Sequence, residues 1–214
     1  MANRSARVEN PCHRKRVPQT NMESHKLAFK FFVETPSNLA VEQFVPVFHR
    51  WIQTRALDGH QLIDVADYKH VHEGPGTVLV SHEANIHADL SDGRLGLLYI
   101  RKQPVPGSFA QRLRTALAYT LRCASLLQND PSLQDRIRFR TNEAIFRIYD
   151  RLHAPNTPET FAQIGPDLDS LLMNLYGPGV QLSHAPGAER LFEVAIFTPQ
   201  SPEFENLLTR IQAV

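Results

Sequence analysis

Histidine and carboxylate side chains gather in one short stretch of the chain. His82, His87 and Asp89 lie in two segments that alternate apolar and polar residues, as β-strands do. If Ala84 and Asn85 form the turn of a tight hairpin, His82 lies opposite His87 and Asp89 shares their face. Imidazole and carboxylate groups that converge in this way bind zinc, iron or manganese. The stretch therefore predicts a divalent-metal site, and histidines on a solvated sheet face are the structural alternative.

This metal hypothesis depends on the register of the hairpin. A shift of one residue would send the two histidines to opposite faces of the sheet. The sequence also contains no HExxH or comparable metal motif with fixed spacing. We therefore expect no resident cofactor and keep a divalent metal as the alternative.

Arginine side chains form the second pattern with chemical meaning. Apolar and basic residues alternate through the segment 136–151, and a turn at Asn142-Glu143 would pair Arg138 with Arg147. One face of this hairpin would be apolar core. The other would carry the candidate binding residues Arg138, Arg140, Arg147, Tyr149 and Arg151.

Like charges directly opposite one another destabilise a sheet, so this arginine face needs carboxylate neighbours or an anionic partner. Guanidinium groups bind phosphate or carboxylate through paired hydrogen bonds. The alternative is internal pairing with the acids Asp64, Asp67, Asp89, Glu143 and Asp150.

Other catalytic patterns are absent from the sequence. No glycine-rich phosphate-binding loop and no Gly-x-Ser-x-Gly elbow occurs. The two cysteines, Cys12 and Cys123, do not form a CxxC pair. These absences argue against phosphate-loop nucleotide binding, serine nucleophiles and thiol redox chemistry.

The elements that must position these residues are those of an α+β fold. Besides the hairpin, strands are expected at 26–34, 61–68, 76–83, 85–90, 94–101, 179–184 and 191–197. Helices are expected at 39–55 with a kink at Pro46, at 109–128, at 156–176 with a break at Gly165-Pro166, and near 202–212. Consecutive strands between helices favour a largely antiparallel sheet with about three helices packed on it.

A local pattern occurs twice. Gly-Pro-Gly at 74–76 and at 177–179 each precedes an alternating segment that ends in Ser-His. Upstream of each, Thr-Pro introduces a helix that contains a further proline. The pattern suggests a degenerate duplication of a strand–helix–strand unit, in which the strand at 61–68 has no counterpart. Chance recurrence of common turns is the alternative.

Composition limits the domain count and the compartment. A chain of 214 residues with 42% hydrophobic residues is long enough for one sizeable core. Residues 1–25 contain five basic and two acidic residues and predict a disordered basic tail, with Met22 as an alternative start; residues 26–214 form the expected domain. With two distant cysteines and no secretory or membrane-spanning stretch, the sequence favours a cytoplasmic protein without a membrane partner.

Three functions stay open at this point. The leading one is a non-catalytic binding or assembly module that presents the arginine face to an acidic protein or a phosphate-bearing ligand. The net charge of +1 argues against nucleic acid as the partner. The second is a metal-dependent enzyme that uses the histidine hairpin. The third is a structural subunit that forms a homo-oligomer through the segment 94–101, which is apolar on both faces.

Overall fold

The computed structural model describes residues 22–34, 39–71, 74–133 and 136–213, which form one antiparallel sheet with helices packed on it. The strands are β1 (Leu27–Val33), β2 (Leu62–Asp67), β3 (Thr77–Ser81), β4 (Ala84–Asp89), β5 (Gly96–Arg101), β6 (Phe139–Ile148), β7 (Gln181–His184) and β8 (Phe192–Phe197). The helices of the described residues are the 3₁₀ helix η1 (Val41–Phe44) and α1 (Val45–Thr54), α2 (Phe109–Gln128), α3 (Pro158–Tyr176) and α4 (Phe204–Ala213). The predicted α+β class is confirmed, with four α-helices in place of about three.

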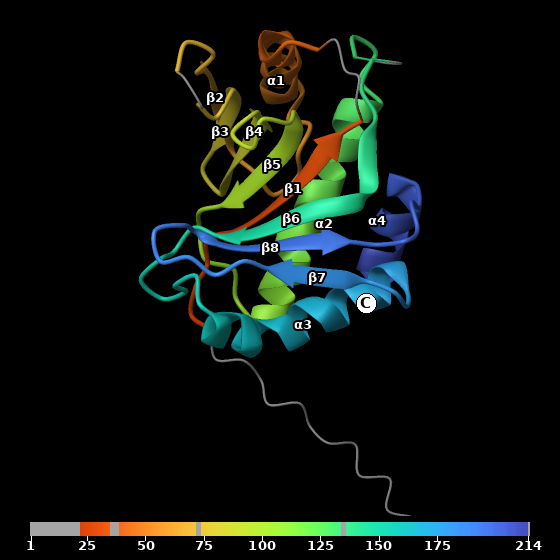
Figure 1. Ribbon diagram of the computed structural model, residues 1–214. Helices are drawn as coiled ribbons and strands as arrows, with labels where there is room; N and C mark the ends of the chain where they lie inside the picture. The colour runs from red at the N-terminus through yellow and green to blue at the C-terminus, as the bar shows by residue number, and fades with distance from the viewer. Residues whose placement is uncertain (1–21, 35–38, 72–73, 134–135, 214) are drawn as a thin grey trace, which may run out of the picture.

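The strand order is β2-β3-β4-β5-β1-β6-β8-β7. From the central pair outward, β1 is followed by β5 and β4, and β6 is followed by β8 and β7. In each half the central strand is followed by a helix, β1 by α1 and β6 by α3. The strand beside it is followed by another helix, β5 by α2 and β8 by α4 (Figure 1). The same topology therefore occurs twice, and β2 and β3 have no counterpart in the second half. The predicted match of the strand at 76–83 with that at 179–184 is wrong, because β7 corresponds to β4 in the sheet order.

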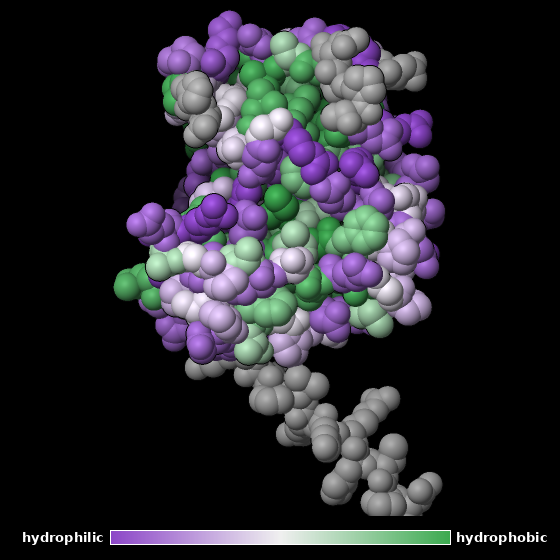
Figure 2. Space-filling view, viewed as in Figure 1, coloured by the Kyte–Doolittle hydropathy of each residue, from purple (hydrophilic) through white to green (hydrophobic). Residues whose placement is uncertain are grey.

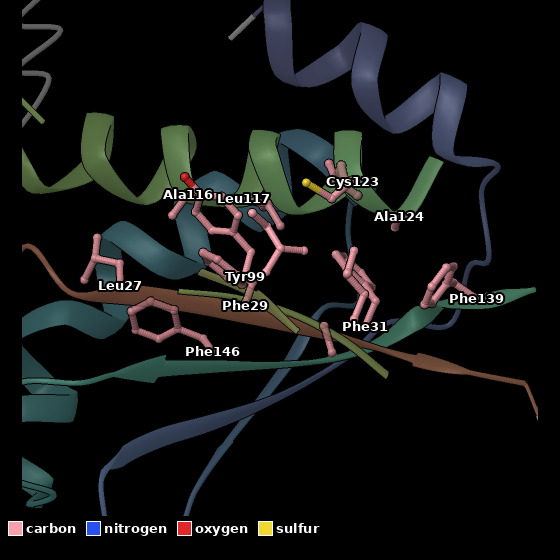
Figure 3. Close-up of a cluster of buried hydrophobic side chains, with 14 of the residues drawn as sticks. Leu27, Phe29, Phe31, Tyr99, Ala116, Leu117, Cys123, Ala124, Phe139 and Phe146 are labelled. Carbon is pink, nitrogen blue, oxygen red and sulfur yellow. The ribbon is translucent and has the colours of Figure 1, made fainter. Parts of the chain in front are cut away.

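Alternation along the strands sends one set of apolar side chains towards α2. Leu27, Phe29 and Phe31 of β1 are each at most 1% exposed. Figure 3 shows these three side chains in a layer with others from β5, β6 and α2, namely Tyr99, Phe139, Phe146, Ala116, Leu117, Cys123 and Ala124. In Figure 1 the strands lie in front of α2, so the view is onto the opposite face of the sheet.

The predicted helix at 109–128 is confirmed in both bounds. The Ser108 hydroxyl accepts a hydrogen bond from the backbone N–H of Gln111, and the Gln111 side chain accepts one from the backbone N–H of Ser108. This reciprocal capping satisfies two amides that the first helical turn leaves without partners.

The two helices with internal prolines behave differently. At Pro46 the helix is divided as expected, because η1 ends at Phe44 and Pro46 lies in the first turn of α1, where proline is tolerated. The break expected at Gly165-Pro166 is wrong, since α3 continues through Pro166. Leu168, Leu172 and other leucines beyond the proline are buried in the core, and this packing holds the second half of the helix in line.

The predicted hairpin over 136–151 is also wrong, because β6 runs without a turn through Asn142-Glu143. These two residues lack the glycine that favours a tight two-residue turn. Both hydrogen-bonding edges of the segment find other partners, β1 on one side and β8 on the other. An irregularity opposite Phe31 and Val33 accommodates the extra residues of β6.

The start of the domain lies earlier than the sequence suggests. Met22 is 4% exposed and packs in the hydrophobic core, and its carbonyl accepts a hydrogen bond from Arg112 of α2. Residues 22–25 therefore belong to the fold, and the remainder of the predicted tail, 1–21, lies outside the described residues.

None of the helices in the described part of the chain combines the length and apolar composition needed to cross a lipid bilayer.

Candidate ligand-binding groove on the outer sheet face

The face of the sheet that points away from α2, called the outer face below, carries a network of charged side chains. Cross-strand pairing aligns two rows on this face, His87-Leu98-Lys30-Ile145 and Asn85-Ile100-Ala28-Arg147. Figure 2 shows hydrophilic side chains in a band across the middle of the same face, over β1 and β5. Charged groups are therefore concentrated at the centre of the sheet.

Lys30 is the most deeply buried cation of this network, with no exposed surface. Its Nζ lies 2.6 Å from Oδ2 of Asp89 and 2.7 Å from Oδ2 of Asp92. Gly96 makes the room for this side chain, because a Cβ at that position would lie 2.6 Å from Cε of Lys30. The glycine on β5 and the lysine on β1 thus form one packing unit.

Arg147 of β6 links the network to the other half of the sheet. Its Nη2 lies 2.5 Å from Oδ1 of Asp92, and its Nε lies 2.6 Å from Oε2 of Glu193. Burial lowers the pKa of Arg147, but the hydrogen bonds to Asp92 and Glu193 outweigh this effect and raise it. For Asp92 the effects are reversed. Burial raises its pKa, but the hydrogen bonds from Lys30 and Arg147 outweigh burial and lower it. Both groups are held in their charged forms.

A groove of about 540 Å³ opens beside Arg147. Arg147, Glu193 and Ser183 line it from the strands β6, β8 and β7. Asp92 lines it from the β4–β5 turn, and Arg190 lines it from the β7–β8 loop. Its volume is within the range of small-molecule sites, which runs from about 300 to 1,000 Å³.

The five predicted binding residues do not form one surface. Arg147 and Tyr149 line the groove, and Nη2 of Arg151 lies 3.4 Å from the carbonyl of Ala188 in the loop beside it. Arg138 and Arg140 lie at the opposite end of β6, where Arg140 pairs with Glu143 at 3.2 Å. The pairing of Arg138 with Arg147 is wrong because it required the hairpin, although the predicted core face of this segment is buried as expected.

The predicted metal residues are separated by the real register of β3 and β4. Val80 pairs with Asn85 and Val78 with His87, so the turn lies at residues 82–83 and not at 84–85. His82 is therefore an exposed turn residue, away from His87. Among the described residues, no group of three or more His, Cys, Asp and Glu side chains is arranged to hold a metal ion.

His87 and Asp89 do share a face of β4, as predicted, but in other roles. Asp89 is bonded to Lys30. His87 is 7% exposed, and burial lowers its pKa to about 4, although Asp89 and the Pro75 carbonyl act in the opposite direction. At neutral pH His87 is an uncharged side chain packed in the sheet.

The segment 94–101, expected to be either central or a subunit interface, is central. Its strand β5 lies between β4 and β1, and Leu97 and Leu98, which point to opposite faces, are 1% and 3% exposed. Both faces of β5 are covered within the chain. The segment 94–101 is therefore not exposed for contact with a second subunit, as the structural-subunit alternative required.

A larger cavity of about 1230 Å³ lies between α2 and α4. Its Arg114 donates hydrogen bonds to the carbonyls of Ile211 and Gln212, which lie at the end of α4. This arginine caps the end of α4. Among the described residues that line the cavity, none is a buried charge comparable to Arg147. The smaller groove on the outer face is therefore the better candidate site.

Sequence reasoning missed most of the groove. The sequence patterns single out Arg147 and Tyr149 but none of Lys30, Asp92, Arg190 and Glu193. Lys30, within the apolar run KLAFKFF of 26–32, is the one local signal of the charge network. A charged side chain inside such a strand requires a buried partner.

Comparison of the chain with protein-family models, curated proteins and solved structures finds no match.

Proposed function

We propose that this protein is a non-catalytic binding module that holds a ligand bearing a carboxylate or phosphate group in the groove on the outer face. The observation that supports this proposal is the rigid placement of Arg147, a buried guanidinium fixed by two carboxylates at the wall of a groove. Side chains locked by neighbouring ion pairs are typical of preorganised sites.

Arg190 supplies the charge that meets the ligand. Arg147 is already neutralised by Asp92 and Glu193, whereas the Arg190 side chain is exposed and makes no ion pair or hydrogen bond within the described residues. A guanidinium of this kind offers paired donors that match the oxygens of a carboxylate or a phosphate. Tyr149 and Ser183 line the same groove, and their side chains carry hydroxyl groups that can form hydrogen bonds.

Among the described residues that line the groove, no nucleophile is paired with a base. Ser183 is on an exposed strand position, and His184 beside it hydrogen-bonds through Nε2 to Oδ1 of Asn156 at 2.8 Å and stacks between Phe161 and Phe192. Because consecutive residues of a strand point to opposite faces, this histidine is not directed at Ser183. Binding without chemistry is the function that this arrangement favours.

Calorimetric titration with inorganic phosphate and with succinate at low ionic strength tests the proposal. Arg190→Ala should weaken binding by about tenfold or more, since a hydrogen bond to a charged group contributes about 1.5–3 kcal/mol. Arg138→Ala is the matched control, because it removes an exposed arginine from the other end of β6 and should leave binding unchanged. The proposal is wrong if neither anion binds, or if both variants bind like the wild-type protein.

A further inference from the structure

We infer that the ligand of this groove is a small zwitterion that carries a cationic ammonium group as well as its carboxylate. The inference rests on the proposed function and specifies the chemical class of the ligand. It follows from the charges of the groove and from which of their atoms already have partners.

The charge network beneath the groove is negative overall. It contains the cations Lys30 and Arg147 and the three carboxylates of Asp89, Asp92 and Glu193. Each cation contacts two of these carboxylates, so the network holds one negative charge more than its cations neutralise. A ligand with an ammonium group would offset this excess, so it should bind more tightly than a simple anion that pairs with Arg190 alone.

The excess charge has a definite position, at Glu193. Asp92 uses both of its oxygens, Oδ1 towards Arg147 and Oδ2 towards Lys30. Glu193 is bonded within the described residues only through Oε2, its side chain is 43% exposed, and it lines the groove. Its second oxygen is therefore available to accept hydrogen bonds from a ligand.

The opposite charge is at Arg190, which lines the same groove. No ion pair joins Arg190 to Glu193 within the described residues. A ligand with an ammonium group at Glu193 and a carboxylate at Arg190 would satisfy both, whereas a ligand with one charge would leave the other group without a partner. The volume of about 540 Å³ suits a ligand of the size of an amino acid or a dipeptide.

Three related probes separate the contributions of the two charges. L-alanyl-L-alanine is the zwitterion, its N-acetyl derivative is an anion, and its C-terminal amide is a cation. By calorimetry, we expect the zwitterion to bind the wild-type protein at least tenfold more tightly than either derivative. In Glu193→Gln the advantage over the N-acetyl derivative should disappear, and in Arg190→Ala the advantage over the amide should disappear.

The outcomes distinguish this inference from the function on which it rests. If the N-acetyl derivative binds as tightly as the zwitterion, the inference is wrong and an anion-binding module remains. If the amide binds most tightly, or if no probe and no inorganic phosphate binds, both are wrong. Should Glu193→Gln lower the melting temperature strongly, the comparison of the three probes on the wild-type protein still decides the inference.

Discussion

Arg147 and Asp92 are joined across β1. Arg147 lies on β6 and Asp92 in the turn between β4 and β5, and the sheet order places β1 between β5 and β6. The turn therefore extends over the outer face to reach β6, and the ion pair connects the two halves of the sheet. This contact shapes one wall of the groove and fixes the guanidinium beside it.

Removing Arg147 should destabilise the fold. Arg147→Ala leaves Asp92 and Glu193 without their shared cation in a partly buried site, and we expect the free energy of unfolding to fall by about 2–4 kcal/mol. Arg138→Ala should change it by less than about 0.5 kcal/mol, because Arg138 is exposed. Urea denaturation of the two variants measures the difference, and equal stability would show that the network is not structural.

Gly96 should not tolerate a side chain. A Cβ at this position would lie 2.6 Å from Cε of Lys30 and 2.6 Å from the carbonyl oxygen of Phe31, so Gly96→Ala should cost about 1–3 kcal/mol. Gly165→Ala is the control, since the nearest atom there is 3.9 Å away and alanine is the better helix former. Its melting temperature should rise, and a rise for Gly96→Ala would contradict the packing described for Lys30.

Stability should depend on pH through His87. Its pKa is lowered to about 4 in the folded state, so between pH 4 and about 6.5 the unfolded state binds a proton that the folded state does not. Stability is therefore lost as the pH falls through this window, by about 1.4 kcal/mol per pH unit at most.

His87→Leu should remove that share of the slope, because leucine does not titrate and suits the apolar neighbours Val78 and Leu98. His82→Gln, at an exposed turn position, should leave the slope unchanged. Urea denaturation at pH 4.5 and pH 7 compares them. The same pH dependence in His87→Leu and in the wild-type protein would show that His87 titrates normally.

The two described methionines Met22 and Met173 test where the fold begins. Met22→Ala should cost about 2–5 kcal/mol because the side chain is 4% exposed within the core. Met173→Ala, whose side chain is 40% exposed, should cost less than about 1 kcal/mol. If thermal denaturation shows that both variants lose the same stability, residues 22–25 are not part of the packed domain.

The sequence predicts elements that depend on local interactions better than elements that depend on contacts between distant parts of the chain. The helix α2 could be predicted in both bounds because Ser108 and Gln111 cap it locally and its apolar residues recur at helical spacing. The core residues within each half of β6 could also be predicted, because alternation over a few residues is a local property. Whether Asn142-Glu143 turns or continues depends on β1 and β8, which the local sequence does not contain.

The groove shows the same limit more strongly. Asp92 and Arg147 are far apart in the sequence, and each has an ordinary local explanation, as a turn residue and as a strand residue. Their ion pair exists because the sheet order brings the β4–β5 turn over β6. The metal-site prediction was wrong for a related reason. The turn between β3 and β4 lies at residues 82–83, so His82 is not opposite His87.

The most direct test of the binding groove is a map of where an anion-bearing ligand binds. The isotopically labelled protein is titrated with L-alanyl-L-alanine, and the amide chemical shifts are followed. The shifts around Arg147, Ser183 and Arg190 should change and saturate with a single dissociation constant. Perturbations confined to the cavity between α2 and α4, or to the end of β6 at Arg138 and Arg140, would contradict the account.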